Sequence, residues 1–283
     1  MFCGFVRVPS NLKECKMKNF LKKHWMDILV VIALIGLAVW GGSVVATRFS
    51  FAKKWVFFEE YFFTNNGYKI LLRGMKNTAI IAVLGLLIGI VIGTLIAVIR
   101  VIPPYKKLVR YAQKVCTVYV AFFRGTPIVV QLLVGYYILL PLLGVRLNPV
   151  MSCVVIFGLN SGAYISEIMR GGINSVDRGQ LEAARAVGMP FSVSMLKIVV
   201  PQAVKNILPT LGNEFITLIK ETAVVGYVGA MDITKAFQDQ GANTYEYMIP
   251  YLVMAGLYIV IVAAIAGLIK LMERKLAKSE RRN

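Results

Sequence analysis

Six long apolar runs dominate this sequence and constrain its fold more than any other feature. They cover residues 28–46, 78–102, 115–143, 149–169, 198–219 and 248–272. A helix rises ~1.5 Å per residue, so about 20 apolar residues cross the ~30 Å hydrocarbon core of a bilayer. With 58% hydrophobic and only 16% charged residues, the chain is too apolar for an ordinary soluble domain. We therefore expect an all-α membrane protein with six spans.

Prolines predict interruptions in two of these runs. The third run contains the sequence RGTP, Arg124 to Pro127. Proline lacks the N–H that continues a helix and restricts the residue before it, so we expect a break or bend there. Pro201 and Pro209 lie in the fifth run. They predict a broken helix of the kind that transporters often use for solute sites and hinges, although kinked packing without transport gives the same pattern.

Basic residues set the expected orientation. The formal net charge of +18 would suggest a nucleic-acid partner in a soluble protein. Here lysines and arginines flank the apolar runs, so topology and contact with anionic membrane lipid explain the charge, and no nucleic-acid partner is expected. With six spans, the basic leader (1–26), the basic loop after the second run and the basic tail (273–283) fall on one side. We predict that this side, with both termini, is the cytosol.

Two segments precede the expected core. Residues 27–47 are predicted to form an extra N-terminal transmembrane helix; the alternative is a signal peptide cleaved near SVVA, which would leave five spans and the same function. Residues 48–77 are predicted to be an outer connecting segment, where the run YKILLRGMKN indicates an amphipathic helix on the membrane surface. The four cysteines and the single His24 show no metal-ligand spacing, so no metal site is expected.

Three glycines in the second run predict a packing face. Gly85, Gly89 and Gly93 recur at intervals of four. This spacing places them on one side of a helix, where they allow a neighbouring backbone to approach closely. We expect a role in helix packing.

Polar side chains inside the apolar runs are candidates for a solute path. Each is costly in hydrocarbon unless it faces a cavity or a partner group. Thr126 and Gln131 lie in the third run, and Asn160, Tyr164 and Glu167 lie four and three residues apart in the fourth, on one helix face. They indicate either a lined path for a polar solute or hydrogen bonds between helices, and Glu167 could instead be exposed at the membrane interface.

The segment 171–197 interrupts the apolar runs with charged, helix-favouring sequence. Residues 180–187 are good helix formers, and Gly188 followed by Pro190 predicts a stop. A second short helix can begin near Phe191. This cytosolic helix, turn and helix would expose Glu182 and Arg185 beside the small Ala183 and Ala184, a surface suited to the groove of another protein, although a solvated surface helix has the same periodicity.

Several of these motifs together resemble one known family. GQLEAARAVGM followed by VVPQA resembles the EAA loop of ABC importer permeases. RGTPIVVQ, NSGAYISEIMRGGI and LPTLGNEFITLIKETAVVGYVG resemble, in order, stretches of the polar amino acid uptake subfamily. The resemblance covers residues 68–272 and implies a type I ABC importer transmembrane domain, a five-helix core with the extra N-terminal helix in front. It implies that the loop 171–197 couples to an ATPase through Gly179, Glu182, Ala183, Ala184, Arg185 and Gly188, and that Thr126, Gln131, Asn160, Tyr164 and Glu167 belong to the substrate path.

The resemblance also implies partners and a function. The chain would be the permease subunit of an ATP-driven importer of polar amino acids in a bacterial cell membrane. It would pair with itself or a similar chain, two ATPase subunits and an extracytoplasmic solute-binding protein. The sequence has no Gly-x-x-x-x-Gly-Lys-Ser/Thr run, so it is not expected to be an enzyme or to hold a cofactor; ATP and Mg would bind the partner ATPase. Glutamine, glutamate and basic amino acids are possible substrates: neutral polar groups favour glutamine, and Glu167 would suit a basic amino acid. A secondary transporter or channel is the alternative.

Overall fold

The computed structural model describes residues 30–43 and 51–280, with the backbone alone for 275–280. The predicted leader (1–26) lies outside the described residues. The chain splits into two compact units, residues 1–57 and 58–283. In the first unit, an apolar helix covers Val30–Ser43 and is shorter than a membrane crossing requires. The predicted extra span (27–47) extends beyond this helix at both ends, outside the described residues, so it stays a prediction.

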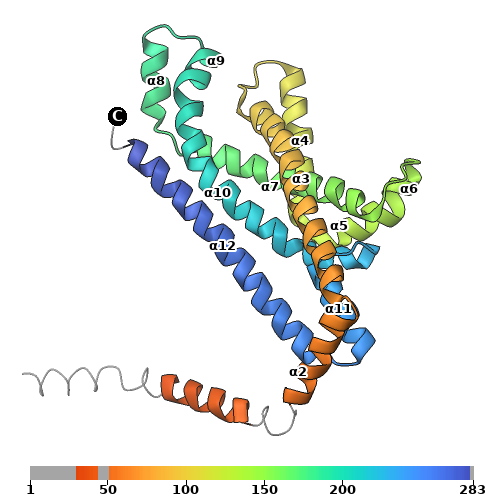
Figure 1. Ribbon diagram of the computed structural model, residues 1–283. Coiled ribbons are helices and arrows are strands. Elements are labelled where there is room, and N and C mark those ends of the chain that lie inside the picture. Colours follow the sequence, from red (N-terminus) through yellow and green to blue (C-terminus); the bar gives the residue numbers. More distant parts are fainter. Residues whose placement is uncertain (1–29, 44–50, 281–283) are drawn as a thin grey trace, which may run out of the picture. The chain divides into compact units, whose positions relative to one another are not determined.

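Between residues 51 and 280 the described chain consists of helical elements joined by short connections, without a strand (Figure 1). Helical elements that follow one another directly, such as α9, η3, α10 and η4, form continuous rods. The elements are α2 (Phe51–Glu59), η1 (Glu60–Thr64), α3 (Gly67–Val101), α4 (Lys107–Gly125), α5 (Ile128–Val134), η2 (Gly135–Leu139), α6 (Leu140–Leu142), α7 (Pro149–Asn174), α8 (Arg178–Ala186), α9 (Phe191–Ser194), η3 (Met195–Val199), α10 (Val200–Glu221), η4 (Thr222–Val228), α11 (Ile233–Thr244) and α12 (Met248–Glu280).

Within the described residues, four helices are long and apolar enough to cross a membrane, or five if one bent pair is a single span. The four are α3, α7, the rod Phe191–Val228 and α12. The bent pair joins Lys107–Gly125 to Ile128–Leu142 at 107°. This bend confirms the break predicted at RGTP, because the helix ends at Gly125 and resumes after Pro127. The expected all-α architecture is present.

Two expectations about helix boundaries were wrong. The run 68–77, expected as an amphipathic helix of a connecting segment, forms the first turns of α3, which continues unbroken to Val101. The fifth run is not broken at its prolines. Pro201 lies at the start of α10, directly after the π-helical turn η3, and Pro209 lies inside α10. The wider turn before Pro201 accommodates the missing N–H without ending the helix.

The contact between α3 and α7 organises the second unit. Gly85, Gly89 and Gly93 of α3 all face α7, and a Cβ at Gly93 would lie 2.8 Å from the Ile165 side chain. In return, a Cβ at Gly158 of α7 would lie 2.6 Å from Ile88 of α3. Both helices therefore contribute small residues, and each inserts isoleucine side chains into the space that the other leaves.

The remaining helices pack around this pair. Helix α10 contacts α7 and also runs along α12, where a Cβ at Gly212 would lie 2.8 Å from Ile269. Helix α11 packs between α3 and α12 through a small apolar cluster that contains Ile233 and Phe237. The outward faces of α3 and α12 keep large apolar side chains exposed, as expected for helices that contact lipid.

Candidate functional site

The charged segment between α7 and α10 forms a helix, a turn and a second helix. Helix α8 begins after Asp177, whose side chain accepts a hydrogen bond of 2.7 Å from the Gly179 backbone N–H. The sequence interpretation missed this cap, although an aspartate just before a helix-favouring run is a typical N-cap signal. Helix α9 begins at Phe191 and continues through η3 into α10. Figure 1 shows α8 and α9 next to each other, beyond the end of α7.

Gly188 ends α8 in the way its sequence predicts. Its φ is +86°, a left-handed conformation that favours glycine. The Met189 N–H donates to the Ala184 carbonyl at 3.1 Å, and the Gly188 N–H donates to the Arg185 carbonyl at 3.0 Å. This pair of bonds is a Schellman motif, which satisfies carbonyls that the helix end leaves free. The turn between the two helices is thus built by the backbone.

An apolar cluster fixes this helix pair to the membrane helices. Val176 before α8, Val199 at the end of η3, and Ala203 and Ile207 of α10 are buried together, and Leu181 of α8 packs against them. Asn206 of α10 also donates to the Ser175 hydroxyl at 2.8 Å. A Cβ at Gly172 would lie 2.3 Å from Ile207, so α7 and α10 touch closely beside the loop. Leu181 therefore links α8 to an apolar cluster at the place where α7 and α10 touch.

The surface of α8 differs at one residue from the sequence expectation. Gly179, Glu182, Ala183, Arg185 and Gly188 are exposed. The expectation that Ala184 is also exposed was wrong: only 4% of its surface is accessible. Ala184 lies three residues after Leu181, so both fall on the face that packs against the chain's own α9 and η3. Its small side chain serves close packing within the chain.

Three of the predicted path residues form a hydrogen-bonded network at the α4–α5 break. The Gln131 amide N–H groups donate to the Thr126 hydroxyl at 2.8 Å, the Thr126 carbonyl at 3.0 Å and the Phe123 carbonyl at 2.8 Å. Asn160 of α7 donates to the Gln131 amide oxygen at 2.8 Å. Gln131 and Asn160 are buried. Their amides therefore satisfy the backbone carbonyls that the break leaves free, and they join the break to α7. Of the two roles that the sequence left open, this is the one of hydrogen bonding between helices.

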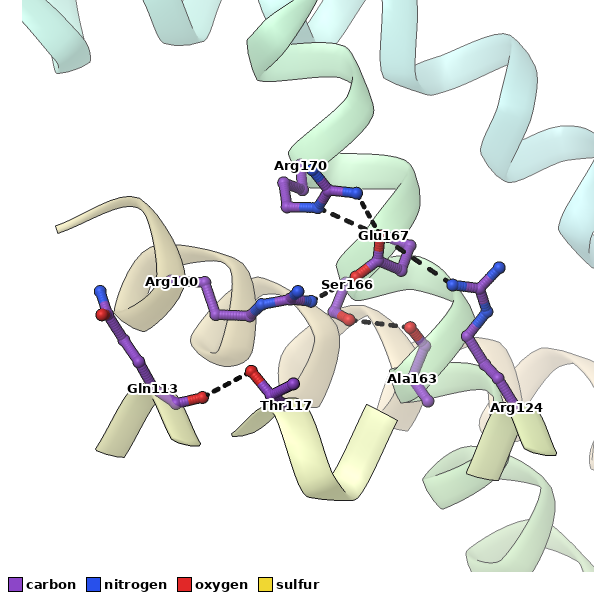
Figure 2. Close-up of polar contacts among 8 residues, drawn as sticks. All are labelled: Arg100, Gln113, Thr117, Arg124, Ala163, Ser166, Glu167 and Arg170. Atoms are coloured by element: carbon purple, nitrogen blue, oxygen red, sulfur yellow. Dashed lines mark hydrogen bonds and ion pairs between the residues drawn. The ribbon is translucent and has the colours of Figure 1, made fainter. Parts of the chain in front are cut away.

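Glu167 lies at the centre of a charged cluster, shown in Figure 2. Its carboxylate pairs with Arg100 of α3 and, at 2.6 Å, with Arg170 one turn further along α7. Arg124, the residue before the last of α4, approaches the same carboxylate to 4.0 Å and lies over the Tyr164 ring at 5.6 Å from its centroid. The Glu167 side chain is 17% exposed. The sequence suggested Glu167 as an anion for a basic solute. In the structure its carboxylate is already paired with arginines, so it is not a free anion.

A carboxylate on α10 is a candidate that the sequence interpretation did not select. Glu214 accepts a hydrogen bond of 3.1 Å from the Ser161 hydroxyl of α7. Ser161 is the residue after Asn160, on the part of α7 that also packs against Gly89. A carboxylate inside an apolar run was the available signal, because such groups are rare in membrane helices and usually face the bundle interior or a polar path.

Comparison with known proteins assigns this arrangement to one family. Residues 89–278 match the family described as the binding-protein-dependent transport system inner membrane component. The chain belongs to this family. A putative glutamine transport system permease protein of Rickettsia bellii is 39% identical over 209 residues, which cover 74% of this chain and 94% of that protein. The arginine transport system permease protein of Bacillus subtilis is 38% identical over 210 residues, with the same coverage.

Solved structures show the same fold in this transport family. A crystal structure described as an amino acid ABC transporter with histidines is 35% identical, has a TM-score of 0.69 and covers 76% of this chain and 98% of its own. The MetNI methionine ABC transporter, at 19% identity and a TM-score of 0.61, supports the fold alone; 75% of this chain and 96% of that chain are covered. The resemblance to type I ABC importer permeases is confirmed, and a secondary transporter or channel is not favoured.

Proposed function

We propose that this transport-system membrane component imports polar amino acids, driven by ATP hydrolysis on separate ATPase subunits. The relatives named for glutamine and arginine transport support this substrate class, since each is more than a third identical over nearly its whole length. The observation that carries the coupling is the exposed helix α8, which packs against α9 and η3 and whose Leu181 joins the apolar cluster of α10. Two permease chains, two ATPases and an extracytoplasmic solute-binding protein complete the transporter, with both termini of this chain in the cytosol.

The exposed residues of α8 and its turn form the proposed ATPase-docking surface. Glu182 and Arg185 present opposite charges one turn apart beside Ala183, and Gly179 and Gly188 shape the two ends of the helix. Ala184 supports this surface from within the chain. Nucleotide-driven movement of the ATPases displaces α8, and the apolar cluster passes the displacement to the membrane helices. ATP and solute are then linked because each binds the two states of the transporter unequally.

The proposed solute path follows the polar face of α7, near the α4–α5 break. An amino acid zwitterion requires donors for its carboxylate and acceptors for its ammonium group. Glu214 supplies a charged acceptor for the ammonium group beside Ser161. Thr126, Gln131, Asn160 and Tyr164 supply neutral polar groups, and the solute exchanges hydrogen bonds with the amide network as the path opens. We therefore favour glutamine or a similar neutral polar amino acid.

The proposal is tested with the permease purified together with its partner ATPase and solute-binding protein and reconstituted in liposomes. ATP hydrolysis is measured across a panel of glutamine, glutamate, arginine, histidine and hydrophobic amino acids. Stimulation by glutamine or a few polar amino acids supports the proposed function. Stable assembly without stimulation by any amino acid contradicts the substrate class, and failure to bind any ATPase contradicts the coupling role.

Charge reversal tests the docking surface separately. Glu182→Arg should leave the permease inserted in the membrane and abolish stimulation of the partner ATPase. Glu60→Arg makes the same reversal on an exposed residue of η1, outside the loop, and should retain stimulation. Unchanged transport in Glu182→Arg would contradict the role of α8.

A further inference from the structure

The charged cluster around Glu167 lies between two elements that transport must move. Arg124 is followed by Gly125 and then by the α4–α5 break, where the helix axis turns by 107°. Glu167 itself lies about two turns before the end of α7 at Asn174, after which the chain enters α8. The cluster therefore lies along α7 between the break and the proposed ATPase-docking helix.

The two sides of the break are attached to α7 in different ways. On the α5 side, Gln131 and Asn160 form a buried hydrogen bond of 2.8 Å. On the α4 side, Arg124 reaches Glu167 only at 4.0 Å, and its side chain is 47% exposed. A buried amide bond is costly to leave unpaired, whereas a partly exposed ion pair exchanges with water at little cost. Further from the break, Tyr119 donates to the Leu159 carbonyl and Val120 is buried with Ala163, so this part of α4 stays on α7. The ion pair of Arg124 is thus the contact that can be released at the last turn of α4.

On the other side of this contact, α3 and α7 are closely packed against each other. Arg100, the partner of the carboxylate on α3, belongs to the helix that interlocks with α7 through Gly89 and Gly93. Arg100 is 19% exposed, so its pairing with Glu167 is shielded more than that of Arg124 or Arg170. The carboxylate is consequently held by α3 and α7 and presents one oxygen to α4.

Charge also makes this carboxylate necessary for the local packing. Three arginines converge on a single glutamate, and Arg124 has its second favourable contact with the Tyr164 ring. Without the carboxylate, the like charges of these three arginines would repel each other, most strongly around the shielded Arg100. The helix whose arginine is held least, α4, would move away first.

From this geometry we propose that Glu167 is a positioning residue: it holds the end of α4 against the α3–α7 pair so that displacement of α8 opens and closes the α4–α5 break. It does not bind the solute. The proposal rests on the proposed function, because coupling means solute imported per ATP hydrolysed. It replaces the sequence expectation that Glu167 lines the path, and it leaves the solute-binding role to the residues nearer the break and to Glu214.

The first experiment separates positioning from solute binding. The variants are measured in the reconstituted transporter, first with glutamine and then with arginine as the solute. Glu167→Gln should raise ATP hydrolysis in the absence of solute. It should also lower the ratio of solute imported to ATP hydrolysed by about fivefold or more, the lower end of typical coupling effects. Glu167→Asp keeps the charge and should retain most of the ratio. Glu214→Gln, the matched loss of a carboxylate that the proposed function assigns to the solute, should raise the KM for import. Glu60→Gln, the same change on the exposed η1, should leave solute-free hydrolysis unchanged.

A double variant tests the route through Arg124. If Glu167 acts by holding Arg124, Arg124→Gln should lower the coupling ratio in the otherwise unchanged protein and change it little further in Glu167→Gln. Additive losses contradict this route. An unchanged ratio in Glu167→Gln together with a raised KM would identify Glu167 as a solute ligand and overturn the proposal.

A second measurement does not depend on the substrate. The four native cysteines are first replaced by alanine. Spin labels are then attached at Val118→Cys in α4 and Met151→Cys in α7, both exposed positions. They report the distance between the two helices in the assembled transporter. Glu167→Gln should broaden this distance distribution or shift it to longer values. An unchanged distribution overturns the proposal, whereas a wild-type transporter that no amino acid stimulates contradicts the proposed function alone.

Discussion

The glycines of α3 allow a graded test of how closely α3 and α7 pack. Gly85, Gly89 and Gly93 lie on one face of the same helix, and all three are buried. A Cβ at Gly85 would have its nearest neighbour at 3.6 Å, which is ordinary contact. At Gly89 the nearest atoms belong to the Ser161 side chain, at 2.9 Å. At Gly93 a Cβ would meet both the Ile165 side chain, at 2.8 Å, and the Ser166 backbone nitrogen, at 2.9 Å.

The expected free energies of unfolding follow from these distances. Alanine favours a helix over glycine by about 1 kcal/mol, and overpacking a close interface costs about 1–3 kcal/mol. Gly85→Ala should therefore be neutral or stabilise by up to about 1 kcal/mol. Gly93→Ala should destabilise by up to about 2 kcal/mol, because the Ser166 backbone must retreat and disturb the neighbouring contact between Gly162 and Ile92. Gly89→Ala should fall between them, since the Ser161 side chain can shift.

The assay is the melting temperature of the purified chain in one detergent, measured for all three alanine variants. A difference of about 2 kcal/mol between Gly85→Ala and Gly93→Ala corresponds to about 4–8 °C in a chain of this size. Gly256→Ala in α12, where a Cβ meets nothing within 4 Å, controls for the helix preference of alanine alone. Equal melting temperatures for Gly85→Ala and Gly93→Ala would refute the reasoning.

The remaining predictions concern the turn, the amide network and a buried cap. Gly188→Val should reduce solute-stimulated ATP hydrolysis without loss of membrane insertion, because its left-handed φ costs a non-glycine residue about 1–2 kcal/mol; full stimulation would contradict this. Gln131→Leu should lower the free energy of unfolding by about 1–3 kcal/mol by leaving buried partners unpaired, and Gln131→Leu with Asn160→Leu should recover part of the loss in melting temperature. Asp232 caps α11 by accepting from the Thr234 and Lys235 N–H groups at 2.9 Å, so Asp232→Ala should cost about 1 kcal/mol of unfolding free energy and Asp232→Asn much less. Burial raises the pKa of Asp232, so the folded chain holds this proton more tightly than the unfolded chain. The free energy of unfolding should therefore fall as the pH rises from the ordinary aspartate pKa through the raised folded-state pKa, and melting curves of Asp232→Asn should lack this decrease.

Much of the fold follows from local sequence signals. Long apolar runs place α3, α7, α10 and α12, and the proline of RGTP places the break between α4 and α5. These signals succeed because helix length in a membrane and the missing proline N–H act within one segment. The start of α3 was misjudged for the same reason: charges at residues 69–76 suggested a surface helix, but nothing local ends the helix before the apolar run begins.

The candidate site was predictable in part. The sequence pattern placed the helix, turn and helix around Gly188, and the structure forms it with a Schellman motif. Helix periodicity could place Asn160 and Glu167 on one face, but it could not assign their partners, Gln131 and Arg100, which come from other helices. For Ala184, the pattern predicted a small residue on a helix but did not indicate which face of that helix the rest of the chain covers.

The sequence by itself determined that this chain is helical, lies in a membrane and carries a charged loop between two spans, because hydropathy, proline and glycine act over a few neighbouring residues. Only the tertiary structure decided how the polar groups within the spans are used. Glu167 is paired with three arginines, two of them from other helices, and Gln131 closes the break against α7. A buried charge or amide is stable only with a suitable partner in space, and that partner is fixed by how the helices pack.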